Sequence, residues 1–174
     1  MRRLWPLCSV LLLTGCLKFH TGSDYNPGSN YSPYKTYYLE RDPHLTRSDP
    51  ETDTNVLVAD RIQATVKEIL GGKGITPAPK ASAAMWIYWS YSIERTPDAP
   101  DRPADSIRTV EESIGHAPAG RVLIIFEMIN AKTEKSLWRG TAESELYPDI
   151  SSRMQAKRVR EAVRSTFKPF PPKD

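Results

Sequence analysis

Hydrophobic positions recur along this chain with two different periods, and each period predicts a different element. Between residues 85 and 94 apolar and polar side chains alternate, which is the period of a β-strand with one buried face. From Val58 to Leu70 apolar residues return every three or four positions, which predicts a helix with one buried stripe. Asn55 is a plausible N-cap of this helix, and Gly71-Gly72 is expected to end it.

Four further segments complete the predicted order. Residues 34–40 are predicted to form a first strand, 121–130 a central strand that is apolar on both faces, and 137–146 a return strand with one polar face. Ser152 and Gln155 fit a capping box that opens a second helix. The order of strand, helix, three strands and helix predicts an α+β two-layer sandwich, with two helices on one face of a largely antiparallel sheet.

A short basic and then apolar leader precedes these elements. Arg2 and Arg3 are followed by a mostly apolar run that is too short to span a bilayer as a helix. The run ends in Leu13-Thr14-Gly15-Cys16, which resembles the lipobox of bacterial lipoproteins. The resemblance implies cleavage before Cys16, a diacylglycerol on its sulfur and an acyl chain on its new amino group, so that the lipid bilayer is a partner of the chain. A plain secreted protein with a chance cysteine is the alternative, and the complete lipobox in register favours the anchor.

The leader sets the expected domain boundaries. Residues 1–15 are a cleaved signal peptide, 16–33 a lipidated tether rich in Gly, Ser, Asn and Pro, and 34–174 a single α+β domain with a Pro-rich loop at 96–120. Leu17 follows the anchor at the position where an Asp is expected to retain a lipoprotein in the inner membrane. By analogy with that sorting rule, we expect the outer membrane of a Gram-negative bacterium, with the domain facing the periplasm.

Composition narrows the function classes. Removing 15 of the 174 residues leaves 159, which suffices for one domain with a core. Because two of the 24 basic residues leave with the leader, the remaining chain has 22 basic and 21 acidic residues, which argues against a nucleic-acid binder. Cys8 also leaves and Cys16 is acylated, so no disulfide is expected.

The residue types that carry chemistry are scattered. Glu143 and Glu145 share one strand face, and two solvated carboxylates on an edge strand explain them without acid/base catalysis. The segment 71–74 lacks the spacing of a phosphate loop and fits a helix end. No histidine lies at ligand spacing from another ligand, so neither a metal nor another cofactor is predicted. The three histidines are His20, His44 and His116. The sequence favours no enzymatic activity.

Strand parity gives a candidate binding surface. If the odd-numbered residues of 85–93 face the helices, Trp86 and Tyr88 lie on the opposite face of the sheet. The rest of that strand face is Ser90, Ser92 and Glu94, which suits a polar rim. An open apolar patch usually marks an interaction site, but the loop 96–120 folding over this face explains the same pattern. A basic set on the second helix, which includes Arg158, is expected to be its solvated outer face.

Four short segments carry a further resemblance. They are 34–37 (YKTY), 70–74 (LGGKG), 130–142 (NAKTEKSLWRGTA) and 159–163 (VREAV). Together they resemble the domain-of-unknown-function 4136 family of bacterial lipoproteins, from about Tyr34 to the C-terminus. Members often have Thr-Gly in the turn where this chain has Thr133-Glu134. The resemblance implies an envelope lipoprotein with an α/β domain and supplies no activity.

Two functions from different classes follow from these patterns. The first is a non-catalytic, membrane-tethered binding or accessory module that docks an envelope protein through Trp86 and Tyr88. The alternative is a carrier or sensor of a small apolar or lipid ligand held between the sheet and the loop. A deep apolar cavity favours the second function, and a flat patch or a sheet-mediated dimer favours the first.

Overall fold

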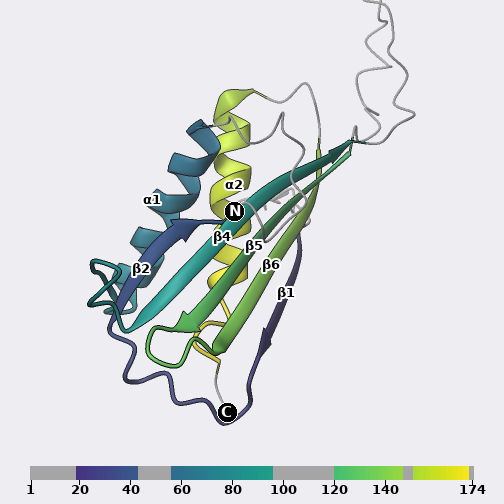
Figure 1. Ribbon diagram of the computed structural model, residues 1–174. Helices are drawn as coiled ribbons and strands as arrows, with labels where there is room; N and C mark the ends of the chain where they lie inside the picture. The colour runs from purple at the N-terminus through teal and green to yellow at the C-terminus, as the bar shows by residue number, and fades with distance from the viewer. Residues whose placement is uncertain (1–18, 43–55, 96–119, 147–150, 173–174) are drawn as a thin grey trace, which may run out of the picture.

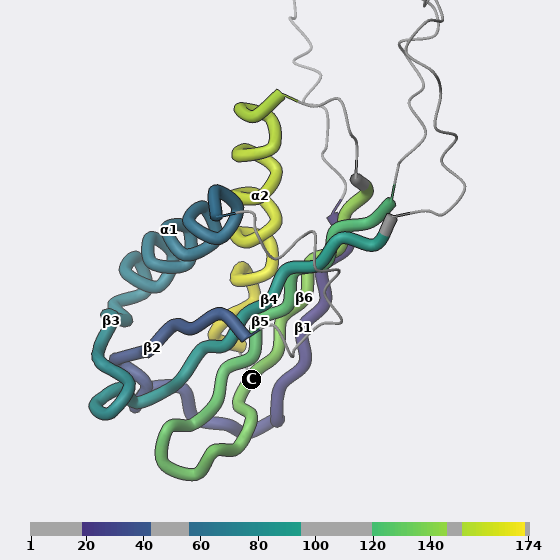
Figure 2. Tube along the Cα trace, turned by 45° about the horizontal axis from the view of Figure 1, so that its top comes forward, coloured from purple at the N-terminus to yellow at the C-terminus, as the bar shows by residue number. Residues whose placement is uncertain are grey.

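The computed structural model describes residues 19–42, 56–95, 120–146 and 151–172. Its elements, in chain order, are β1 (His20–Tyr25), β2 (Thr36–Arg41), α1 (Val56–Gly72), β3 (Thr76–Pro77), β4 (Met85–Arg95), β5 (Gly120–Asn130), β6 (Ser136–Leu146) and α2 (Ser152–Phe167). The strands form one sheet in the order β1-β6-β5-β4-β2-β3. Both helices lie on the same face of this sheet (Figures 1 and 2).

The α+β class with two helices agrees with the sequence prediction, whereas the sheet is mixed and contains two strands more than expected. Neighbours β1 and β6, β6 and β5, and β5 and β4 are antiparallel. β2 is parallel to both β4 and β3. The parallel pair β2 and β4 follows from the chain order, because α1 crosses between them and returns the chain in the same direction.

Part of the segment expected as a tether is a strand. β1 pairs with β6 over its full length, from His20 opposite Glu143 to Tyr25 opposite Trp138. All six of its side chains are exposed, so the strand is held by backbone pairing and leaves no hydrophobic alternation in the sequence. β1 makes β6 an interior strand, and the expectation that Glu143 and Glu145 lie on an edge strand was wrong.

The two helices begin and end close to the expected positions. α1 continues through Gly72, and the chain then turns at Gly74, whose φ of 73° is one that glycine adopts without strain. The N-cap of α2 is Ser151, whose side chain accepts a hydrogen bond from the backbone N–H of Met154. The expected cap at Ser152 was therefore one residue late: Ser152 with Gln155 fits the capping-box spacing, but it is Ser151 that accepts from the third helical N–H.

The core lies between the helices and the sheet and ends in a cluster of aromatic rings. Trp138 is 1% exposed, and its ring centroid lies 5.4 Å from that of Phe167 and 5.4 Å from that of Phe170. The indole lies over Gly140, where an added Cβ would lie 2.7 Å from Trp138 Cζ2 and 2.6 Å from Thr166 Cγ2 on α2. Gly140 thus makes room for both the indole and the helix.

Candidate functional site

The structure places Trp86 and Tyr88 on the face of the sheet that the helices leave uncovered. Their neighbours Met85, Ile87 and Trp89 are fully buried in the core on the other face. Trp86 lies opposite Tyr38 on β2 and opposite Ile129 on β5. Both Trp86 and Tyr88 are half-buried, so each ring keeps part of its surface accessible.

Lys80 joins these rings into one cluster. Its Nζ lies 5.4 Å from the ring centroid of Tyr38 and 5.5 Å from those of Trp86 and Tyr88. The same Nζ donates a hydrogen bond of 2.9 Å to Glu40 Oε2. Trp86 Nε1 in turn donates to the Lys80 backbone carbonyl at 3.1 Å. We call Tyr38, Glu40, Lys80, Trp86 and Tyr88 the aromatic cluster.

The electrostatics of the aromatic cluster keep Lys80 charged. Its hydrogen bonds with Glu40 and, second, with Tyr88 raise the pKa of the Lys80 ammonium above its ordinary value. A cation within about 6 Å of an aromatic centroid is attracted by the negative face of the ring. The ammonium of Lys80 therefore makes favourable contacts with three rings that lie together at the surface.

The polar rim expected beyond these rings is different in the structure. Ser90 and Ser92 are 1% and 3% exposed, and Ile125, which lies opposite Ser90, is 6% exposed. The centre of this face is therefore buried at Ser90, Ser92 and Ile125, while Trp86 and Tyr88 keep part of their surface accessible at the β2 side. The loop 96–120, named as a possible cover, lies outside the described residues except for Gly120.

The other residues considered for chemistry do not come together in the described part of the chain. Glu143 forms an ion pair with Arg121 across the strands, at 3.1 Å, in an exposed position. His20 lies on β1 opposite Glu143. Residues 16, 44 and 116 lie outside the described ranges. Within those ranges there is no group of three or more His, Cys, Asp or Glu residues that could hold a metal ion.

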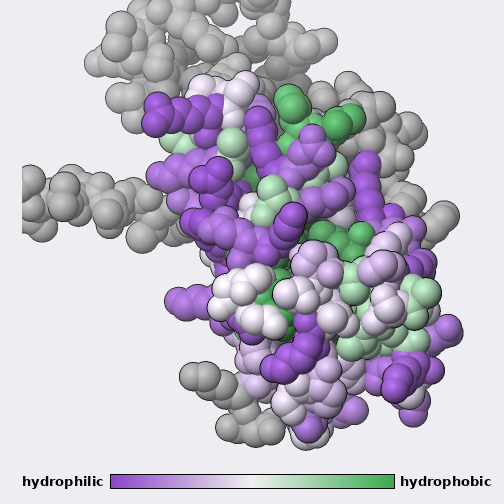
Figure 3. All heavy atoms as spheres, turned by 90° about the vertical axis from the view of Figure 1, so that its left-hand side faces the viewer, coloured by the Kyte–Doolittle hydropathy of each residue, from purple (hydrophilic) through white to green (hydrophobic). Residues whose placement is uncertain are grey.

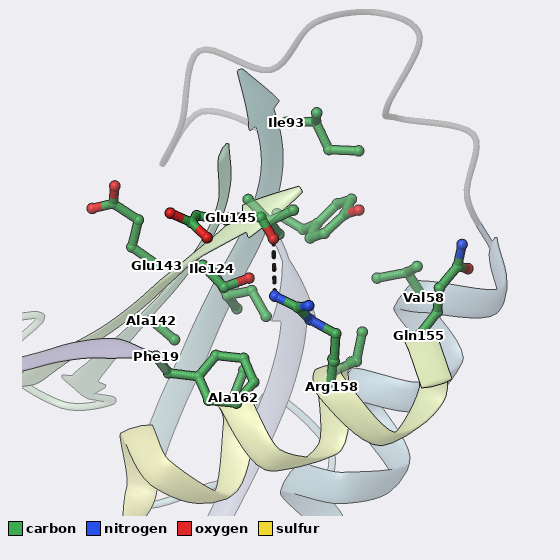
Figure 4. Close-up of a pocket in the computed structure, with 14 residues that line it drawn as sticks. Phe19, Val58, Ile93, Ile124, Ala142, Glu143, Glu145, Gln155, Arg158 and Ala162 are labelled. Atoms are coloured by element: carbon green, nitrogen blue, oxygen red, sulfur yellow. Dashed lines mark hydrogen bonds between the residues drawn. The ribbon is translucent and has the colours of Figure 1, made fainter. Parts of the chain in front are cut away.

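A cavity of about 150 Å³ lies on the helix side, between α2, the start of α1 and the ends of β4, β5 and β6 (Figure 4). This space differs from the one expected from the sequence, which lay between the sheet and the loop 96–120. Its apolar lining consists of Phe19, Val58, Tyr91, Ile93, Val122, Ile124, Ala142, Val159 and Ala162. Ser144, Gln155, Arg158 and the two glutamates 143 and 145 complete it.

One cation reaches this cavity from α2. Arg158 Nη2 donates a hydrogen bond of 3.0 Å to the backbone carbonyl of Glu145, which holds the guanidinium at the rim. Figure 4 shows Glu143 pointing away from the cavity. Arg158, expected on the solvated face of α2, is half-buried and reaches the end of β6 with its guanidinium. Deeper inside, burial raises the pKa of the Tyr91 hydroxyl, as expected for a phenol in apolar surroundings.

The outer surface near α1 and β2 is different in character. Figure 3 shows this side of the molecule as mostly hydrophilic, with apolar residues in small groups. Charged residues tie the helices together there, as in the ion pair of 2.7 Å between Arg164 of α2 and Glu68 of α1. No helix in the described ranges is long and apolar enough to cross a membrane.

The sequence profile of the domain of unknown function DUF4136 matches residues 21–172, which is most of the chain. The chain belongs to the DUF4136 family. The resemblance inferred from short segments is thus confirmed, and the match begins within β1, earlier than the sequence analysis placed it. No relative was found among curated proteins.

Comparison with solved structures finds several similar chains. A PDZ domain protein from Parabacteroides distasonis matches with a TM-score of 0.60 and 15% identity, over 88% of this chain and 36% of that structure. This DUF4136 chain thus spans about a third of that protein's length. A PelC dodecamer from Paraburkholderia phytofirmans matches with a TM-score of 0.51 and 10% identity, over 90% of this chain and 100% of that one. Lipoprotein GNA1162 from Neisseria meningitidis gives a TM-score of 0.39 at 10% identity, over 79% of this chain and 99% of that one.

Proposed function

We propose that this DUF4136 protein is a non-catalytic, membrane-tethered lipoprotein of the bacterial envelope that docks a protein partner through the aromatic cluster. In this proposal acylated Cys16 anchors the chain in the outer membrane, and the domain faces the periplasm. The leader with its lipobox supports the anchor. The fold supports the docking role, because the helices cover one face of the sheet and leave the other to the aromatic cluster.

The observation that carries this proposal is the arrangement of three aromatic rings around one charged lysine. Tryptophan and tyrosine dominate the binding energy of protein interfaces, since each offers a large apolar area with few rotatable bonds. Lys80 Nζ lies 5.4–5.5 Å from the centroid of each ring. A partner that covers the aromatic cluster gains by burying the apolar surface of the rings, and the Lys80–Glu40 hydrogen bond offsets part of the cost of removing both charges from water.

The first partner to test is a second copy of this chain. One protein with this fold, PelC, is a dodecamer in its solved structure, and it matches 90% of this chain. The aromatic cluster lies at the β2 side of the sheet, where β3 covers β2 over two residues. The remaining outer edge of β2 stands beside the cluster, so a neighbouring copy could contact both.

A second candidate function is favoured by the cavity. A largely apolar space, partly open to solvent, that receives one cation at its rim suits a small amphipathic ligand better than a protein surface. In this role the domain carries or senses the ligand while the anchor keeps it at the membrane.

Paired substitutions test the docking role. Trp86→Ser with Tyr88→Ser removes two rings from the aromatic cluster, and Tyr25→Ser removes one exposed ring from β1 as the control. Urea unfolding followed by circular dichroism measures the fold, and sedimentation together with crosslinking in intact envelopes measures association.

We expect the double variant to keep its fold and lose association, and the Tyr25→Ser variant to keep both. If the wild-type chain sediments as a monomer but forms a specific crosslink to another envelope protein, that protein is the partner and a second copy of the chain is not. If the double variant unfolds cooperatively at much lower urea, the rings are part of the core and the docking proposal fails.

A further inference from the structure

The cavity beneath α2 has the size of a short apolar group. Its volume is about 150 Å³. An apolar cavity of about that volume takes up a molecule the size of benzene, with roughly six carbons. Phe19, Val58, Ile124 and Val159 supply an aliphatic and aromatic lining, so an occupant gains by leaving water and needs no hydrogen-bond partner inside.

The charged residues in the lining of the cavity are Arg158, Glu143 and Glu145. Arg158 is fixed there by its hydrogen bond to the Glu145 carbonyl. Glu143 is engaged with Arg121 at 3.1 Å on the uncovered face of the sheet and points away from the cavity. A ligand whose apolar end fills the cavity thus meets a guanidinium at the mouth, and guanidinium groups pair with carboxylate and phosphate oxygens.

The cavity lies close in sequence to the proposed membrane anchor. Phe19 lines the cavity and follows Cys16 by only three residues. Three residues span at most about 11 Å even when fully extended, so the lipid attached at Cys16 starts within that distance of Phe19. The cavity therefore lies at the end of the domain that the proposed anchor holds close to the bilayer.

We propose that this cavity binds the end of an acyl chain, with the carboxylate or phosphate of a single-chain lipid at Arg158 when the lipid is free. The inference rests on the second candidate function and on the proposed anchor. The acyl chain can come from two sources, which are the lipid attached to Cys16 and a lipid taken from the membrane.

A titration with sodium carboxylates from butanoate to decanoate tests the site. The readout is the methyl NMR spectrum of the full mature chain in its non-lipidated form, made with Cys16→Ser behind a leader that lacks the lipobox. Each added methylene is expected to tighten binding about fourfold, and the gain is expected to level off near six carbons, when the cavity is full. The shifted methyl signals are expected to be those of Val58, Ile124 and Val159.

Three variants separate the site from unspecific adsorption. Ala162→Leu fills the cavity from α2 and is expected to weaken octanoate binding at least tenfold, while Ala156→Leu, on the same helix but outside the cavity lining, is expected to leave it unchanged. Arg158→Gln is expected to weaken binding of octanoate and leave binding of octanol unchanged. Equal binding by wild type and the Ala162→Leu variant overturns the proposal, as does an affinity that does not depend on chain length.

The natively lipidated chain, in detergent micelles, distinguishes the two sources. If it no longer responds to octanoate while the non-lipidated form does, its own acyl chain occupies the cavity. If both forms bind octanoate equally, the ligand comes from the membrane. The Trp86→Ser/Tyr88→Ser variant is expected to bind octanoate like wild type, so loss of partner docking and loss of the lipid site are measured separately.

Discussion

Gly140 on β6 has no room for a side chain, and a single added methyl group tests how the core is packed. A Cβ at this position would lie 2.7 Å from Trp138 Cζ2 and 2.6 Å from Thr166 Cγ2. Carbon atoms prefer separations of about 3.5–4.0 Å, so either the indole or α2 must move by about 1 Å. The indole is 1% exposed and is packed against Phe167 and Phe170, which leaves it no free direction.

The expected cost follows from these contacts. Overpacking a core costs about 1–3 kcal/mol, and a clash with two buried groups belongs at the upper end of that range. Replacing glycine in a strand also restricts the unfolded chain, which returns about 0.5–1 kcal/mol. The net expectation for Gly140→Ala is a loss of about 2 kcal/mol, measured by urea unfolding, with a fall in Tm of roughly 4–8 °C.

Two companion variants make this result interpretable. Gly71→Ala, in α1, meets no atom within 4 Å of the new Cβ, and is expected to stabilise the chain by about 0.5–1 kcal/mol. Trp138→Phe in the Gly140→Ala background is expected to recover part of the loss, because the smaller ring leaves space and Trp138 Nε1 has no acceptor among the described residues. If Gly140→Ala is as stable as Gly71→Ala, the close packing of Trp138 over Gly140 is refuted.

Three further predictions concern other parts of the molecule. Glu134 has a φ of 55°, which costs a side-chain-bearing residue about 1 kcal/mol, so Glu134→Gly is expected to raise the free energy of unfolding by up to that amount; an unchanged urea midpoint contradicts this. Burial raises the folded-state pKa of Tyr91 above its ordinary value of 10.0, so its contribution to stability is complete below pH 10 and falls as the pH rises further. Tyr91→Phe is expected to make the free energy of unfolding fall less steeply above pH 10. If it falls as steeply as in the wild type, ionisation of Tyr91 is not the cause. Cys16→Ala is expected to leave the chain unprocessed or soluble; membrane partition that survives an alkaline wash, together with normal processing, contradicts the anchor.

The sequence predicted the elements whose side chains are sorted by burial. The alternation along β4 placed Trp86 and Tyr88 on the face opposite the helices, and the buried residues of β4 on the other face. β1 was missed because its side chains are all exposed, so only backbone pairing with β6 defines it. Lys80 was missed because it lies between strands in a turn-rich segment, and nothing local shows that the chain brings it over three rings.

The position of Arg158 at the cavity was also missed, because it depends on a contact between two elements. A helical basic face indicates solvent exposure on average, and Arg158 shares its spacing with residues that do face solvent. Its place at the rim depends on the end of β6, to which it donates a hydrogen bond at 3.0 Å. This contact joins residues that are 13 positions apart, because α2 packs on β6. The hydrophobic pattern within one helix or strand does not predict a contact between two elements.

The central claim, that the aromatic cluster docks a protein partner, is tested most directly by crosslinking from within the cluster. A photoreactive phenylalanine analogue at position 88 in intact cells is compared with the same analogue at position 64, an exposed site on α1. If the aromatic cluster docks a partner, position 88 gives one defined covalent adduct, which is absent from position 64 and lost in the Trp86→Ser background. Adducts of the same pattern from both positions, or none from position 88, would contradict it.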